Sequence, residues 1–191
     1  MGKGRIEAFS DGVIAIIITI MVLELRPPEG TTLDALRELV PTFISYALSF
    51  VLVAIYWVNH HHLFQAVHAV NGRVLWANLL LLFCLSLFPF GTAWMGEHEF
   101  APVPVASYAV ILLAAAMSYF LLVRTLIPIQ PEGSHLAEAI GNDWKGKVSP
   151  LIYVAAIPIA LVLPVLAFAM FVAVALIWVV PDTRIERTLS R

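Results

Sequence analysis

Residues 5–25 read Arg-Ile-Glu-Ala-Phe-Ser-Asp-Gly-Val-Ile-Ala-Ile-Ile-Ile-Thr-Ile-Met-Val-Leu-Glu-Leu, and this stretch decides the fold class. Its apolar part, Ile6 to Leu25, has the length of roughly 20 helical residues that is needed to cross the core of a bilayer. No cleavage site of small residues follows it, which favours a retained helix over a removed signal peptide. The sequence therefore predicts a membrane-spanning helix close to the N-terminus.

The rest of the chain has the same apolar character. Of its 191 residues, 61% are hydrophobic and only 13% are charged, and the mean hydropathy is +0.91. Soluble domains carry about 25% charged residues and keep a large area facing water. We therefore expect an all-α, polytopic membrane protein in a lipid bilayer. The net charge of −2 argues against a nucleic-acid partner, and the single cysteine, Cys84, excludes an intrachain disulfide.

Further spans are predicted wherever long apolar runs are bounded by proline, glycine or charged residues. Three such runs are Leu33–Asn59, Val74–Met95 and Val103–Ile127. The polar stretch Gln130–Lys147 predicts a loop. The uncharged stretch Val148–Val180 is too long for one span, and Pro158 and Pro164 interrupt it. It predicts a hairpin of two short helices that turns near Leu163–Pro164, and one long kinked helix is the alternative.

The distribution of positive charges favours six spans over five. With six spans, one side of the membrane holds Lys3, Arg5, Arg73, Arg124, Lys145, Lys147, Arg184, Arg187 and Arg191. The other side holds only Arg26 and Arg37. Because cytoplasmic loops carry the excess of Lys and Arg, we expect one six-helix domain over residues 1–191. It would lie in the cell membrane with both termini in the cytoplasm.

The first helix has two distinct faces. At about 100° per residue, Phe9, Gly12, Ile20 and Leu23 lie within roughly 40° of the direction of Ile16. Thr19 lies roughly 60° to one side of Ile16, and Asp11 points about 140° away from it. If symmetric copies met at an axis, Ile16, Ile20 and Leu23 would form stacked apolar rings, which can close a pore by dewetting. Ordinary helix packing is the alternative explanation of this stripe.

Several motifs resemble those of one known family. Arg5, Phe9, Ser10 and Asp11, followed by an Ile/Thr-rich helix, resemble the signature of the transmembrane protein 175 family of endosomal and lysosomal potassium channels. The resemblance continues through Trp57-x-x-His60, Asn78 and Leu87-Phe88-Pro89-Phe90. It covers about the first half of the chain, and the second half resembles the family only in its pattern of spans.

The resemblance implies a potassium-permeable channel that has no Thr-Val-Gly-Tyr-Gly filter. The chain has room for one six-helix repeat, so the resemblance implies a homotetramer with the first helix of each copy at the axis. It assigns the hydrophobic constriction to Ile16, with further rings at Ile20 and Leu23, and potassium selectivity to Thr19. A bond from the Thr19 hydroxyl to a carbonyl of its own helix is the alternative role for that residue.

The polar part of the motif is interpreted as structural. Ser10 and Asp11 point away from the apolar stripe and need polar partners, because polar groups within a membrane usually face a partner or water. Candidate partners are Arg5, Asn59, His60 and Asn78. The expected structural network consists of Arg5, Phe9, Ser10, Asp11, Trp57, His60 and Asn78.

Two other classes of site were considered. His60, His61, His62 and His68 suggest a metal site, but adjacent histidines fan around a helix and no carboxylate or cysteine accompanies them. We expect no metal site there, no cofactor and no enzymatic activity. Potassium is expected only as the permeant ion. A secondary transporter of a cation or small solute is the alternative function, although no charged residue lies at any predicted midplane.

Overall fold

The computed structural model describes residues 2–131 and 144–179, and all regular structure within these ranges is helical. The elements are α1 (Lys3–Leu23), α2 (Leu33–Glu38), α3 (Val40–Gln65), α4 (Gly72–Ser86), α5 (Phe88–Glu97), α6 (Pro102–Leu126), the short 3-10 helix η1 (Ile127–Ile129), α8 (Trp144–Val162) and α9 (Pro164–Val179). The prediction of an all-helical fold is therefore confirmed.

The spans follow the predicted order. Within the described residues, five helical segments are long and apolar enough to cross a membrane, and α9 is a shorter apolar helix. With 16 residues, α9 is about 24 Å long, which is less than the roughly 30 Å of a bilayer core. The predicted hairpin is confirmed, because α8 ends at Val162, α9 begins at Pro164, and the two helices pack against each other.

The structure corrects three predicted boundaries. The second span continues to Gln65 instead of ending near Asn59, and its first part, Leu33–Glu38, is a separate helix, α2. The third span is not continuous, because α4 ends at Ser86 and α5 begins at Phe88. In the predicted loop Gln130–Lys147, residues 144–147 already belong to α8; residues 132–143, like Arg184, Arg187 and Arg191, lie outside the described residues.

Local sequence explains where these helices begin. Prolines occupy the first turn of α3, α5 and α6, where the missing N–H costs no helical hydrogen bond. Asn71 caps α4, since its Oδ1 accepts from the backbone N–H groups of Arg73 at 3.0 Å and Val74 at 3.1 Å. Pro89 cannot donate a backbone hydrogen bond, which accounts for the break between α4 and α5.

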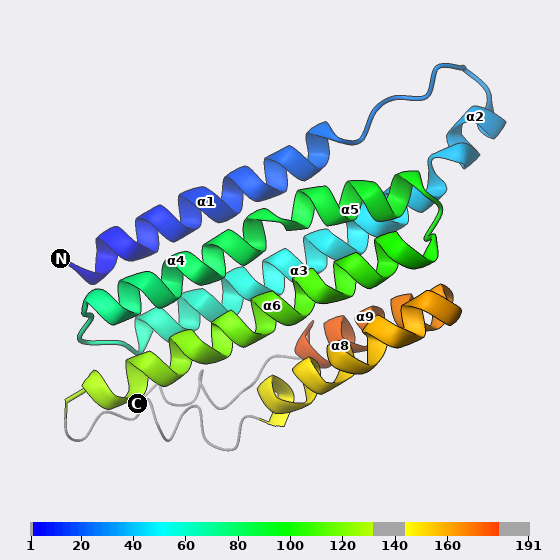
Figure 1. The fold of residues 1–191 in the computed structure, drawn as a ribbon. Coiled ribbons are helices and arrows are strands. Elements are labelled where there is room, and N and C mark those ends of the chain that lie inside the picture. Colours follow the sequence, from blue (N-terminus) through cyan, green and yellow to red (C-terminus); the bar gives the residue numbers. More distant parts are fainter. Residues whose placement is uncertain (1, 132–143, 180–191) are drawn as a thin grey trace.

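The bundle places α1 at one edge. Figure 1 shows α1 along one side of the molecule and the α8–α9 hairpin on the opposite side, with α3 to α6 between them. Helix α1 packs against α3, α4 and α5. The core behind it contains the fully buried rings of Phe88, Tyr108 and Phe171, which contact one another edge to face. Among the described residues, one long face of α1 is left largely uncovered in the monomer.

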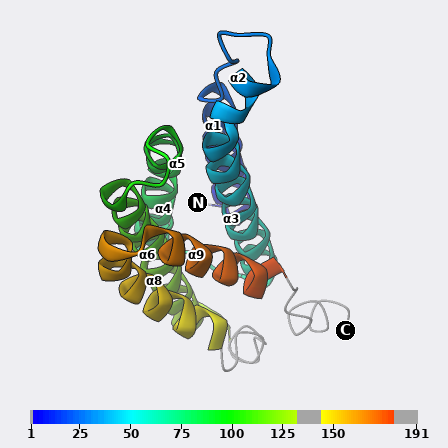
Figure 2. The same ribbon diagram turned by 90° about the vertical axis from the view of Figure 1, so that its right-hand side faces the viewer.

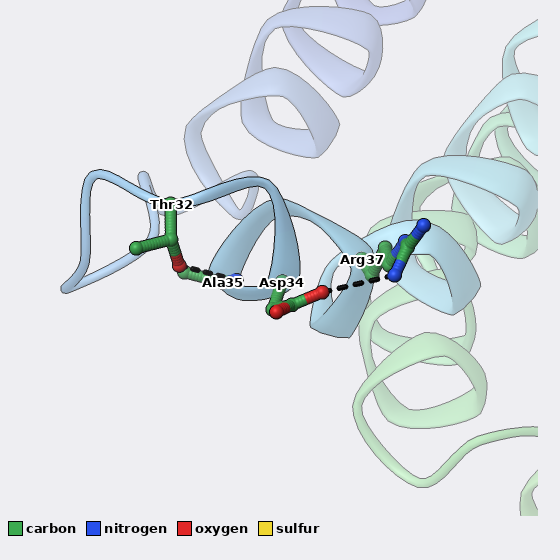
Figure 3. A network of polar contacts seen from close by, with 4 residues as sticks. All are labelled: Thr32, Asp34, Ala35 and Arg37. Atoms are coloured by element: carbon green, nitrogen blue, oxygen red, sulfur yellow. Dashed lines mark hydrogen bonds and ion pairs between the residues drawn. The ribbon is translucent and has the colours of Figure 1, made fainter.

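Helix α2 lies apart from the bundle. Figure 2 shows α2 beyond the end of α1, at the start of α3, and none of its residues is buried. Figure 3 shows how the segment is held locally: Thr32 Oγ1 accepts from the backbone N–H of Ala35 at 3.2 Å, and Arg37 pairs with Asp34 at 2.9 Å. An exposed ion pair of this kind contributes little to stability, so α2 depends chiefly on its cap and its neighbours.

Candidate functional site

The two faces of α1 have different environments. The buried side consists of Ile6, Ser10, Ile14, Ile17 and Met21. The opposite side carries large apolar residues that are open in the monomer. Phe9 is 56% exposed, Ile16 58%, Ile20 42% and Leu23 79%. Since large apolar patches on a protein surface mark an interaction site, this stripe is the first candidate feature of the site.

Ser10 is held by a buried hydrogen-bonded chain that joins three helices. Asn78 of α4 donates from Nδ2 to Ser10 Oγ at 2.9 Å. Its Oδ1 lies 2.8 Å from Nε2 of His60 on α3, and because an amide oxygen only accepts, Nε2 carries the proton. All three side chains are buried. The His60 ring also stacks on Phe64 with centroids 4.5 Å apart. This chain fixes the rotation of α1 relative to α3 and α4.

Asp11 has a different partner from Ser10. The indole Nε1 of Trp57 donates to Asp11 Oδ1 at 2.9 Å, and the Trp57 ring stacks on His61 at 5.7 Å. Asp11 and Trp57 are both exposed in the monomer. The carboxylate is thus bound to the side of α3 and does not point along the stripe that contains Ile16.

Within the described residues, the candidate partner Asn59 and the motif residues Arg5 and Phe9 are not joined to these bonds. Asn59 Nδ2 donates to the Ile55 carbonyl of its own helix at 2.7 Å, so it is not a partner of Ser10 or Asp11. Arg5 and Phe9 lie on the exposed side of α1. His61 contacts Gln65 at 2.8 Å. In residues 2–131 and 144–179, no group of three or more His, Cys, Asp or Glu side chains is placed to hold a metal ion.

Thr19 makes the bond to its own helix that was the alternative role for this residue. Its hydroxyl donates to the Ile16 carbonyl at 2.8 Å. The donated proton leaves the lone pairs of Oγ1 available, and the side chain is exposed beside the stripe. The Thr19 hydroxyl can therefore donate to its own helix while its oxygen stays accessible on the open side of α1.

A second buried polar cluster was not predicted. Thr92 of α5 donates from Oγ1 to Ser49 Oγ at 2.7 Å, and Ser49 Oγ lies 2.6 Å from the hydroxyl of Tyr108. Thr92 Oγ1 also lies 3.9 Å from Met21 Sδ on α1. Ser45 donates to the Thr92 carbonyl at 3.1 Å. The spacing of Ser45 and Ser49, four residues apart on one helix face, is the signal that could have revealed this cluster.

The start of α1 is tied to the end of α3. Lys3 Nζ donates to the carbonyl oxygens of Gln65 at 3.2 Å and Val67 at 3.0 Å. These carbonyls lie at and just beyond the C-terminus of α3, where a positive charge is favourable. The N-terminal half of α1 therefore has a third attachment in addition to those of Ser10 and Asp11.

Comparisons with known proteins agree with this architecture. Over 190 residues, which are 100% of this chain and 99% of the relative, the chain is 51% identical to a potassium channel of Chryseobacterium sp. (strain P1-3). The family model described as endosomal/lysosomal potassium channel TMEM175 matches residues 5–89.

The chain belongs to the TMEM175 family. The solved structure of a Chamaesiphon minutus homologue of the lysosomal potassium-selective channel TMEM175 has the same fold, with a TM-score of 0.83 and 30% identity over 93% of this chain and 96% of that chain. A relative named endosomal/lysosomal proton channel TMEM175 from Gallus gallus is 31% identical over 132 residues, and the match spans only 26% of that longer protein.

Family membership establishes the broad class of the protein. TMEM175 proteins are ion channels and not enzymes, and no cofactor is indicated for them. The apolar helices and the channel relatives together define a multi-pass membrane protein of a cation-channel family.

Proposed function

We propose that this TMEM175 protein is a potassium-permeable channel in which four copies surround one axis and α1 lines the pore. The relatives named potassium channel support the permeant ion. The carrying observation is the exposed apolar stripe on α1, opposite the side that is packed and hydrogen-bonded to the bundle. Such a stripe needs a partner, and copies of itself around an axis would supply one.

The stripe supports a hydrophobic constriction in place of a carbonyl filter. Ile16, Ile20 and Leu23 recur at intervals of four and three residues, so symmetric copies would stack them into three successive rings. Branched apolar rings of this kind exclude water when the conduit is narrow. The proposal makes Ile16 the narrowest ring, because it lies nearest the middle of the exposed stripe, with Ile20 and Leu23 as added layers.

Thr19 is proposed as the potassium-selective group. It lies between Ile16 and Ile20 in sequence, and its hydroxyl proton is already directed to the Ile16 carbonyl. An oxygen presented without its proton is a suitable ligand for a partly dehydrated cation. Four such oxygens at one level would replace part of the hydration shell of a potassium ion.

Ser10 and Asp11 are proposed to position α1 and not to bind ions. Ser10 is buried and bonded to Asn78, and Asp11 is bonded to Trp57. With His60, these residues would hold the pore helix at the correct rotation and depth, and Arg5 and Phe9 would complete the motif at the inner mouth. We also propose the cell membrane as the location, with both termini in the cytoplasm, from the distribution of Lys and Arg.

Single-channel recording of the purified protein in planar bilayers tests this function. Unitary currents carried by potassium support the channel. Saturable, gradient-coupled flux without unitary events would instead establish the alternative, a secondary transporter of a cation or small solute. Because the vertebrate relatives are named proton channels, the recording is repeated with potassium replaced by a large organic cation under a pH gradient. A current that persists unchanged would identify protons, and not potassium, as the permeant ion.

Ile16→Ala provides the test of the constriction. A smaller side chain should weaken the hydrophobic barrier and raise the potassium current several-fold. Val110→Ala is the matched control, because Val110 is half exposed but lies on α6. Equal currents in the wild type and Ile16→Ala would remove Ile16 from the constriction while leaving the channel function standing.

A further inference from the structure

The pore proposal does not use a cavity that lies on the other side of the bundle. It has a volume of about 210 Å³ and lies between α3, α6, α8 and α9. Its walls include the buried side chains of Leu52, Tyr153 and Val174. It extends along α6 from Ala116 to Arg124, a distance of about 12 Å at 1.5 Å per residue.

The two ends of this cavity differ in charge. Arg124 lies in the last turn of α6 and Lys147 in the first turn of α8, so both basic residues are at the same end. Lys145, also in that turn, has its Nζ 5.9 Å from the ring centre of Trp178, which lines the cavity. None of the described residues that line the cavity is acidic. Among the described residues, the cavity therefore has a mainly apolar interior and basic residues at one end.

Two of the polar side chains that line the cavity are bonded to neighbours in the bundle. Asn59 donates to the Ile55 carbonyl at 2.7 Å, and Trp178 Nε1 donates to Ser149 Oγ at 2.9 Å. Arg124 differs from them. Its guanidinium lies 5.0 Å from the ring centre of Phe120 and forms no ion pair with a carboxylate of residues 2–131 or 144–179. A guanidinium has five N–H donors arranged to fit a phosphate.

The basic end of the cavity lies at the same end of the bundle as the start of α1. Gln130, just beyond η1, accepts from the backbone N–H of His68 at 2.8 Å, which joins the end of α6 to the end of α3. Lys3 is bonded to that same end of α3. In the proposed orientation this end faces the cytoplasm, where the leaflet is rich in anionic lipid.

We propose that the cavity binds one anionic phospholipid of the cytoplasmic leaflet, with its phosphate at Arg124 and Lys147 and part of an acyl chain along Leu52 and Val174. Charge complementarity selects an anionic headgroup, and the apolar interior selects an amphiphile over a soluble anion. The inference rests on the proposed orientation but is independent of the proposed pore and of the ion that permeates.

Native mass spectrometry of the full-length assembly in detergent measures the binding. The probes are phosphatidylglycerol, phosphatidylcholine with the same chains, glycerol 3-phosphate and oleate. We expect phosphatidylglycerol to bind at least about tenfold more tightly than phosphatidylcholine, since charge-assisted contacts to the phosphate add to chain burial. Glycerol 3-phosphate should bind at least about tenfold more weakly than phosphatidylglycerol, because it lacks the chain.

Two variants locate the site by independent means. Arg124→Gln removes the guanidinium, and Ala116→Phe fills part of the cavity without changing the charge. Both should weaken phosphatidylglycerol binding about tenfold or more. Arg73→Gln is the matched control, because Arg73 is an exposed cation in the first turn of α4 and does not line the cavity. It should change the affinity less than twofold.

Three results would overturn the proposal. The first is unchanged phosphatidylglycerol affinity in both Arg124→Gln and Ala116→Phe, provided that each variant assembles as the wild type does. The second is an equal loss in Arg73→Gln, which would indicate a general surface charge effect. The third is oleate binding that depends on Arg124 while phosphatidylglycerol binding does not, which would assign the cavity to fatty acids.

Discussion

The indole nitrogen of Trp57 donates to a carboxylate oxygen of Asp11 at 2.9 Å, and this bond joins the side of α3 to the motif of α1. It lies next to the Ser10 bond to Asn78, so neighbouring residues of α1 are attached to different helices. Two adjacent attachments that diverge in direction restrict rotation of α1 about its own axis more than either one alone would.

Loss of the Asp11 carboxylate should therefore damage assembly more than ion selectivity. We expect Asp11→Ala to lower the yield of assembled protein and its melting temperature, measured by size-exclusion chromatography with thermal scanning. Asp11→Asn keeps an oxygen acceptor for Trp57 and should recover most of the loss. Normal assembly of Asp11→Ala with an altered potassium/sodium permeability ratio would instead show that Asp11 contacts the permeant ion.

Asn78 should be the more sensitive member of the buried chain. Asn78→Ala leaves the polar groups of Ser10 and His60 without their partner in a buried site, which should cost about 1–2 kcal/mol. The matched control is Asn59→Ala, since within the described residues the Asn59 side chain bonds only to a carbonyl of its own helix. Thermal unfolding in detergent provides the measurement, and equal melting temperatures for the two variants would contradict the anchoring role of Asn78.

The position of Ile16 at the axis can be tested by metal block. Cadmium binds thiolates, and four cysteines at one level of a narrow pore would hold it. In a Cys84→Ala background, which removes the single native cysteine, Ile16→Cys should become reversibly blocked by micromolar cadmium. Val110→Cys on α6 should not. Cadmium insensitivity of a conducting Ile16→Cys channel would place this side chain away from the conduit.

Thr19 has a close structural counterpart that serves as its control. Both Thr19 and Thr125 donate to the carbonyl three residues earlier, at 2.8 Å in each case, but Thr125 lies on α6. Thr→Val keeps the shape and removes the oxygen. Thr19→Val should lower the potassium/sodium permeability ratio several-fold, measured from reversal potentials, whereas Thr125→Val should leave it unchanged. Equal ratios in Thr19→Val and the wild type would restrict Thr19 to its local bond.

The close approach of α5 to α3 predicts a packing defect. A Cβ atom added at Gly96 would lie 2.5 Å from Ser45 Oγ and 2.8 Å from the Thr42 backbone Cα. Because a backbone atom cannot move aside, Gly96→Ala should destabilise the protein by about 1–3 kcal/mol. At Gly4 nothing lies within 4 Å of an added Cβ, so Gly4→Ala should be nearly neutral. Thermal unfolding of the two variants checks the difference.

The fold was predictable because lipid imposes long apolar helices, and proline marks where they stop. The hairpin at Leu163–Pro164 followed from this rule alone. The break at Leu87 was not predicted, although Pro89 lies beside it. The residues on both sides of the break are apolar, so the sequence looks like one continuous span. The end of α3 was placed too early, since the apolar run ends at Asn59 but the histidines after it remain helical.

The candidate site was predictable to a smaller extent. Periodicity identified the face of α1 that contains Ile16, because spacing alone determines which residues share a face. Spacing did not determine which partner each polar residue would choose. Trp57, and not Asn59 or Arg5, is the partner of Asp11, and the cluster of Ser49, Thr92 and Tyr108 was not anticipated. Pairing depends on how the helices cross, which a single sequence does not specify.

The placement of the polar attachments along α1 has a mechanical consequence. Near its N-terminal end the helix is held through Lys3, Ser10 and Asp11, and farther along Met21 lies against Thr92. Between these points, the described residues that support α1 are apolar side chains such as Ile14 and Ile17, which are buried against the bundle. Trimming those supports would let the middle of α1 bend toward the bundle while both ends stay fixed. In the proposed pore, this would alter the width at Ile16 without changing any residue proposed to face the ions.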